Sequence, residues 1–236
     1  MLRSIFVMCV AIMLSTLMFA DLAFSVGEWE SIDIGENTEA GSTDINGDVF
    51  TIVANGADIW STADECRYVY QEVSGNFDIS AHFVSLENTD PWAKAGLMVR
   101  QSLDANSQHA YMNITIENGA KLIHRDALGA ITGPEPYEQN FQIPLWLKLD
   151  RNGDEFSGFW SEDGANWEPA DVPGTPSVGT VVMTDPVFVG IAVTSHAAGV
   201  LTEAIVESVE GGGSFRLAVE PHESLILEWG RIKAGM

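Results

Sequence analysis

Two nearby segments in which apolar and polar residues alternate constrain the fold more than any other feature of the chain. In the run 94–100, Ala95, Leu97 and Val99 occupy every second position, and 109–116 repeats the alternation. Because successive side chains of a β-strand point to opposite faces, one face of each predicted strand is apolar. The other face carries Lys94, Met98, Arg100, His109, Tyr111, Asn113 and Thr115. The two segments therefore predict adjacent strands whose polar and basic face is a candidate binding surface.

Turn dipeptides recur along the chain, whereas helix signals are nearly absent. Asn-Gly and Asp-Gly pairs such as Asn46-Gly47, Asn152-Gly153 and Asp163-Gly164 separate alternating runs, which is typical of β-hairpins. Without crossover helices, the pattern predicts an all-β, mostly antiparallel sandwich or barrel. The predicted strands lie near 49–53, 66–73, 77–87, 94–101, 108–117, 120–126, 141–150, 154–161, 187–195, 201–209, 215–219 and 224–232.

Residues 1–25 have the pattern of a secretory signal peptide. Arg3 precedes a mainly apolar run over 5–19, and Ala23-Phe24-Ser25 fits the small-x-small cleavage rule. The run is shorter than the roughly 20 apolar residues of a membrane span, although an uncleaved anchor is the alternative. We therefore expect a secreted protein, extracellular or in the cell envelope, with no membrane partner after cleavage.

The remaining sequence predicts one sandwich domain over 26–210 and a short tail. Gly211-Gly212-Gly213 resembles a linker, so 211–236 is expected to form a C-terminal β-hairpin docked on the sandwich or on another chain. Cys66 is the only cysteine after the signal segment, which excludes an intramolecular disulfide. It is interpreted as a small buried hydrophobe, with a reactive thiol as the alternative.

The formal net charge of -23 excludes nucleic acid as an expected partner, because a polyanion would be repelled over most of the surface. Two segments share the spacing Asp-x-Asn-Gly-Asp, in which alternate oxygens are compatible with calcium. They lack the glycine and the final glutamate of an EF-hand loop, so hairpin turns flanked by acids explain them better. The residues are Asp44, Asn46 and Asp48, and Asp150, Asn152 and Asp154. No cofactor is expected, with calcium as the alternative.

Catalytic motifs are missing from the sequence, whereas tryptophans are plentiful. The glucanase signature Glu-x-Asp-x-x-Glu does not occur, and neither does Gly-x-Ser-x-Gly or His-Glu-x-x-His. Indole rings stack on sugar faces, so the tryptophans are candidate carbohydrate contacts, with a core role as the alternative. Trp92 is the best candidate, because it follows a proline in a turn before a strand.

An ordered set of short motifs resembles secreted bacterial modules of the concanavalin A-like lectin/glucanase superfamily, which are related to laminin-G-like and "regulation of enolase"-type domains. The resemblance spans roughly residues 40 to 210. It rests on Gly56-Ala57-Asp58-Ile59-Trp60, Tyr68-Val69-Tyr70-Gln71, Gly75-Asn76-Phe77-Asp78-Ile79, Lys94-Ala95-Gly96-Leu97-Met98-Val99-Arg100, Trp146-Leu147-Lys148-Leu149, Ser161-Glu162-Asp163-Gly164-Ala165-Asn166-Trp167 and Gly190-Ile191-Ala192-Val193-Thr194-Ser195-His196.

The resemblance implies a jelly-roll sandwich of two curved antiparallel sheets with a concave ligand face. Carried onto this chain, that face would display Lys94, Arg100, His109, Tyr111, Trp146 and His196, with Asp58, Trp60 and Trp92 at the rim. Lys94, Arg100 and Asn113 are the residues expected to hydrogen-bond the hydroxyls or acidic groups of a glycan. The absence of the carboxylate motif departs from the enzymatic members of the superfamily.

The leading hypothesis is a secreted, non-catalytic carbohydrate-binding or adhesion module. The basic groups on one face favour uronic-acid or sulfated glycans slightly over neutral ones. A structural or protein-interaction domain at the cell surface is the second hypothesis, and an atypical glycoside hydrolase or lyase is the third.

Overall fold

A computed structural model describes residues 28–134 and 141–215. The predicted signal peptide lies outside this part, as do residues 216–236 of the predicted C-terminal hairpin. The described residues form 16 strands, arranged in two large sheets and one small hairpin. Within these residues there is no helix long and apolar enough to cross a membrane.

The six-stranded sheet has the order β1 (Glu30–Ile34), β6 (Cys66–Val73), β15 (Val187–Thr194), β8 (Lys94–Arg100), β9 (His109–Thr115) and β10 (Gly119–Arg125). The eight-stranded sheet has the order β13 (Glu168–Pro169), β12 (Glu155–Ser161), β11 (Leu145–Asn152), β7 (Phe77–Leu86), β16 (Thr202–Gly213), β3 (Val49–Ala54) and β2 (Ser42–Asn46), with β14 (Val178–Thr180) paired to β12. The hairpin consists of β4 (Ile59–Trp60) and β5 (Ala63–Asp64).

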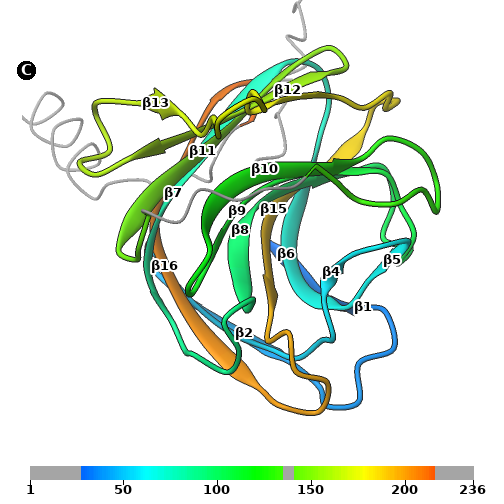
Figure 1. Ribbon diagram of the computed structural model, residues 1–236, viewed down its shortest axis with the longest axis vertical. Helices are drawn as coiled ribbons and strands as arrows, with labels where there is room; N and C mark the ends of the chain where they lie inside the picture. The colour runs from blue at the N-terminus through cyan, green and yellow to red at the C-terminus, as the bar shows by residue number, and fades with distance from the viewer. Residues whose placement is uncertain (1–27, 135–140, 216–236) are drawn as a thin grey trace, which may run out of the picture.

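The two large sheets pack face to face, and neighbouring strands are antiparallel (Figure 1). The predicted all-β jelly-roll sandwich is therefore confirmed. The concave side of the six-stranded sheet faces away from the eight-stranded sheet, and β4 and β5 lie on that concave side (Figure 1).

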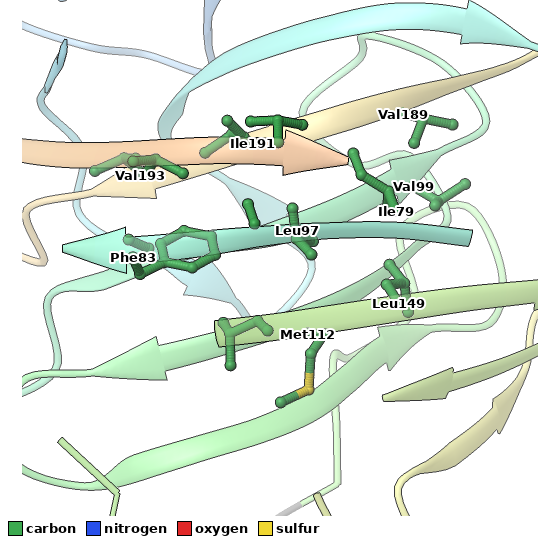
Figure 2. Packing of buried hydrophobic residues seen from close by; sticks show 14 of the residues in the cluster. Ile79, Phe83, Leu97, Val99, Met112, Leu149, Val189, Ile191 and Val193 are labelled. Carbon is green, nitrogen blue, oxygen red and sulfur yellow. The ribbon is translucent and has the colours of Figure 1, made fainter. Parts of the chain in front are cut away.

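Alternation along the strands builds the core between the sheets. The residues predicted to face inward in β8 and β9 are buried there, and Figure 2 shows them against side chains of the opposite sheet. Each valine, leucine, isoleucine, methionine or phenylalanine among them contributes about 1.5–3 kcal/mol when fully buried. The labelled core residues are Ile79, Phe83, Leu97, Val99, Met112, Leu149, Val189, Ile191 and Val193.

Two glycines on the concave side allow the six-stranded sheet to curve. A Cβ at Gly96 would overlap the carbonyl oxygen of Met112 on the neighbouring strand. A Cβ at Gly190 would overlap the carbonyl oxygen of Val69 in the same way. Because curvature compresses the concave side of a sheet, these positions leave no room for a side chain.

The three glycines expected to form a linker continue strand β16 instead. Gly211 pairs with Ile79 and Gly213 pairs with Phe77, so the strand runs past the predicted domain end at residue 210. A side chain at Gly212 would meet the carboxylate of Asp78, which explains the absence of side chains here. The run therefore reflects crowding on a paired strand rather than flexibility of a linker.

Candidate functional site

The hairpin β4–β5 covers one part of the concave face, so this part is not open to solvent. Ile59 is buried against a second hydrophobic cluster on that face, and Trp60 packs against the same cluster. Two loops hold the hairpin: Asp64 N–H donates to the carbonyl of Ala105 at 2.9 Å, and Thr132 N–H donates to the carbonyl of Ser61 at 2.8 Å. The strand residues beneath it are Tyr68, Tyr70, Met98, Tyr111, Ile123 and Ala192.

Beneath the hairpin lies a buried ionic group that we call the Asp64 cluster, formed by Asp64, Arg100, His109 and Arg125. Arg100 Nη1 lies 2.7 Å from Asp64 Oδ2, and Arg125 Nη2 lies 2.6 Å from Oδ1. His109 Nδ1 lies 3.2 Å from Oδ2. All four side chains are fully buried. One carboxylate therefore joins the hairpin to strands β8, β9 and β10.

The protonation states in the Asp64 cluster follow from its contacts. Burial alone would raise the pKa of Asp64, but the charges and hydrogen bonds of His109, Arg100 and Arg125 hold it well below its usual range. Burial lowers the pKa of His109, and the attraction of Asp64 opposes this only in part. His109 Nε2 is buried and has no hydrogen-bond partner, so a proton there would be unsatisfied. The cluster thus holds an ionised Asp64 beside a histidine whose protonation is disfavoured by burial.

The expectation that Arg100, His109, Tyr111 and Asn113 face a ligand is wrong for these four side chains. Each of them is fully buried. Tyr111 Oη donates to the carbonyl of Ala192 at 2.9 Å, and Asn113 Nδ2 donates to the carbonyl of Lys121 at 3.0 Å. Their alternation was predicted correctly, but the hairpin β4–β5, from an earlier part of the chain, covers Arg100, His109 and Tyr111.

Trp60 and Trp146 also lie elsewhere than expected. Trp60 packs over the concave face as part of the covering hairpin rather than standing at its rim. Trp146 belongs to β11 of the eight-stranded sheet, where its ring stacks on His82 at 5.0 Å between centroids. Gly164 approaches the same ring so closely that a Cβ there would lie 2.8 Å from it. Neither tryptophan extends a concave ligand surface.

Cys66 lies in the same concave-face cluster and is buried. Burial raises the pKa of its thiol to about 12. The interpretation as a buried hydrophobe is confirmed, because a thiolate is the reactive form of cysteine.

The other four predicted site residues gather where the loops before β8 and after β15 meet. Together with Asp90 they form what we call the Asp58 cluster: Asp58, Asp90, Trp92, Lys94 and His196. Lys94 Nζ lies 2.5 Å from Asp58 Oδ1 and 3.3 Å from the carbonyl oxygen of Trp92. The Lys94 side chain is only 2% exposed, whereas Asp58 is 27% exposed. Burial lowers the pKa of Lys94, and the nearby Asp58 offsets this in part.

His196 connects the two carboxylates of the Asp58 cluster. Its Nε2 lies 3.3 Å from Asp58 Oδ2, and its Nδ1 lies 2.9 Å from Asp90 Oδ1. The residue has a φ of 54°, a left-handed conformation uncommon for a residue with a side chain. The preceding Ser195 anchors this turn, because its hydroxyl donates to the carbonyl of Gly56 at 3.2 Å. Strained backbone of this kind is concentrated at functional sites.

Trp92 supplies the exposed apolar surface of the Asp58 cluster. Its side chain belongs to a turn in which Trp92 N–H donates to Asp90 Oδ1 at 2.8 Å, and the residue is 37% exposed. Lys94 Nζ lies 5.8 Å from the ring centroid. The cluster therefore contains an indole ring on which a ligand can stack. Beside it lie part-exposed carboxylates and an imidazole that can form hydrogen bonds.

Sequence reasoning missed three residues of these clusters. Asp90 had a usable signal, because an aspartate before Pro91 and Trp92 favours a turn in which its carboxylate caps the backbone. Asp64 and Arg125 had none, since the cluster joins residues 61 positions apart in sequence. Such long-range pairing does not appear in local periodicity.

The two Asp-x-Asn-Gly-Asp segments form hairpin turns. Gly47 lies between β2 and β3 with φ of 64°, and Gly153 lies between β11 and β12 with φ of 63°. The interpretation as Asn-Gly turns is confirmed. In the part of the chain that the structure describes, no three histidine, cysteine or acidic side chains converge on a metal position.

One solved structure, with a TM-score above 0.5, supports the fold. No protein-family model and no curated protein matches the sequence. A functionally unknown protein from Saccharomyces cerevisiae is 16% identical, with a TM-score of 0.56 over 80% of this chain and 97% of that one. The chain also matches the GH43 protein BlXynB from Bacillus licheniformis (14%, TM-score 0.49, 72% of this chain and 37% of that one). A Ca2+/Man3GlcNAc-bound VIP36 domain matches at 9% identity, with a TM-score of 0.44 over 83% and 87% of the chains.

Proposed function

We propose that this protein is a secreted, non-catalytic carbohydrate-binding module whose ligand contacts the Asp58 cluster. The observation that carries the proposal is the part-exposed Trp92 ring beside the part-exposed side chains of Asp58, Asp90 and His196. Sugar rings stack on indoles, and their hydroxyl groups donate to carboxylates. The lysine that fixes Asp58 keeps one acceptor in place before a ligand arrives, and a preformed site loses less entropy on binding.

The charges of the cluster favour a neutral glycan over an acidic one. Lys94 and Arg100, which suggested an acidic ligand, already pair with Asp58 and Asp64. The remaining exposed charges of the Asp58 cluster are carboxylates, and the whole chain has a net charge of -23. An anionic sugar would therefore meet like charges without a free cation in the cluster to compensate.

Replacing the stacking ring tests the proposal directly. Isothermal titration would use neutral cello-, xylo- and manno-oligosaccharides, with oligogalacturonates as the acidic comparison. We expect one of the neutral series to bind and Trp92→Ala to weaken it at least about tenfold, equivalent to ~1.4 kcal/mol. Trp167→Ala is the matched control, because this half-buried tryptophan packs beside Lys148 on the other sheet. Binding of none of these glycans, or equal binding by both variants, would contradict the proposal.

A further inference from the structure

A groove lies beside the Asp58 cluster at the same end of the sandwich. It consists of two adjoining cavities of about 520 and 420 Å³ that share Gln142. We call it the end groove. It lies between the end of β7, Ile116 after β9, the segment 141–145 and the end of β12. Each cavity falls in the size range of ligand sites, about 300–1,000 Å³.

The end groove has an aromatic floor and a polar rim. Phe141 and Trp160 lie with ring centroids 4.3 Å apart, and both pack against the core, which holds them in place. The exposed side chains along the rim are Asn88, Gln142 and Glu162. Fixed rings with amide and carboxylate groups beside them match the apolar faces and hydroxyl edges of a sugar chain.

One loop connects the end groove with the Asp58 cluster. Asn88 lines the groove and Trp92 belongs to the cluster, so their Cα atoms are at most about 14 Å apart. The turn after β9 braces this loop: Glu117 N–H donates to the carbonyl of Pro91 at 3.2 Å, and Asn118 Nδ2 donates to it at 3.0 Å. The two surfaces therefore adjoin across a loop that is tied to the sheet.

We infer that the end groove continues the glycan site, so that the ligand is a linear neutral oligosaccharide running from Trp92 across the loop to Gln142. This inference rests on the proposed function and specifies its substrate class. A single sugar ring cannot reach both surfaces, whereas a chain of several rings can. Glu162 on the rim and Glu117, which accepts from Asn88 at 3.5 Å, disfavour an anionic chain here as well.

The test measures affinity against chain length, with the three neutral series taken from disaccharide to hexasaccharide. For the series that binds, we expect the hexasaccharide to bind about tenfold or more tighter than the disaccharide, equivalent to ~1.4 kcal/mol. Gln142→Trp places a large ring at the exposed position shared by both cavities and should abolish this gain while leaving disaccharide binding unchanged. Leu128→Trp is the matched control, because Leu128 is 63% exposed and lies beyond the far end of β10.

The outcomes separate this inference from the proposed function. A Trp92-dependent affinity that does not change with chain length would overturn the groove and leave the proposed function standing. A gain with chain length that survives Gln142→Trp would also overturn it. If none of the oligosaccharides binds, both the proposed function and the groove are wrong.

Discussion

The concave side of the six-stranded sheet carries two ionic clusters that differ mainly in their access to water. The Asp64 cluster is fully buried beneath the hairpin, and its one carboxylate is shared by two arginines and a histidine. The Asp58 cluster lies nearer the opposite end of β8, and Asp58, Asp90 and His196 all remain part-exposed. The same types of residue are therefore shielded from water at one end and accessible to it at the other.

The difference in desolvation predicts a difference in how much each cluster contributes to stability. Removing one partner of a fully buried ion pair leaves a charge that water cannot reach, so the pair is needed for folding. A part-exposed pair keeps its hydration, so its loss costs little stability. The predictions below test this contrast, from the largest expected effect to the smallest.

Asp64→Asn should have the largest effect. It leaves Arg100 and Arg125 buried without a counter-charge, which costs about 3–5 kcal/mol of unfolding free energy. Urea unfolding followed by tryptophan fluorescence would measure the loss. A variant within about 1 kcal/mol of the wild type would show that the buried cluster does not hold the hairpin in place.

His109→Gln should change how stability depends on pH. The folded state lowers the pKa of His109, so below about pH 6.5 the unfolded chain binds a proton that the folded chain does not. This contribution therefore weakens stability as the pH falls below that value and is constant above it. Urea unfolding at several pH values would show a shallower rise from acid to neutral pH in the variant than in the wild type. An opposite difference would mean that His109 is charged in the cluster.

Asp58→Asn is the counterpart of Asp64→Asn at the exposed end. Lys94 keeps the carbonyl of Trp92 as an acceptor, and the new amide oxygen can accept a hydrogen bond as well. Lys94 is itself buried, so the loss of its counter-charge is not negligible, but Asp90 still attracts it. We expect a loss of about 1–3 kcal/mol in the same unfolding measurement, smaller than that of Asp64→Asn because only one buried cation is affected. A loss as large as that of Asp64→Asn would make both clusters structural and would weaken the case for a ligand at Asp58.

His196→Gly should have the smallest effect on stability. Glycine adopts the left-handed backbone conformation without strain, which gains about 1 kcal/mol of stability. The loss of the two part-exposed contacts between His196 and the carboxylates of Asp58 and Asp90 costs a similar amount or less. Thermal melting should therefore change little, whereas glycan affinity should fall. A clear fall in melting temperature with unchanged affinity would assign His196 to the fold.

Much of the sandwich could be predicted from local patterns. The strand limits expected at 66–73 and 187–195 agree closely with β6 and β15, because long β-branched or aromatic runs bounded by turn residues carry a strong signal. The hairpin β4–β5 was missed, since strands of two residues have no measurable period. The prediction of the candidate site was therefore only partly correct. Trp92 and Lys94 lie in the site, whereas Arg100 and His109 lie on the predicted face but are covered by the hairpin β4–β5, which was not predicted.

The sequence by itself determined that the chain forms strands, which side of each long strand is apolar and where the hairpins turn, because all of these depend on residues close together in the chain. Only the tertiary structure decided which polar groups meet water. Asp64 pairs with Arg100 and Arg125, which lie 36 and 61 positions away in the sequence. The curvature of the six-stranded sheet determines which segment can pack on its concave side. Whether a polar face is buried depends on segments that are distant in the sequence and fold over it, and local sequence patterns do not predict which segments these are.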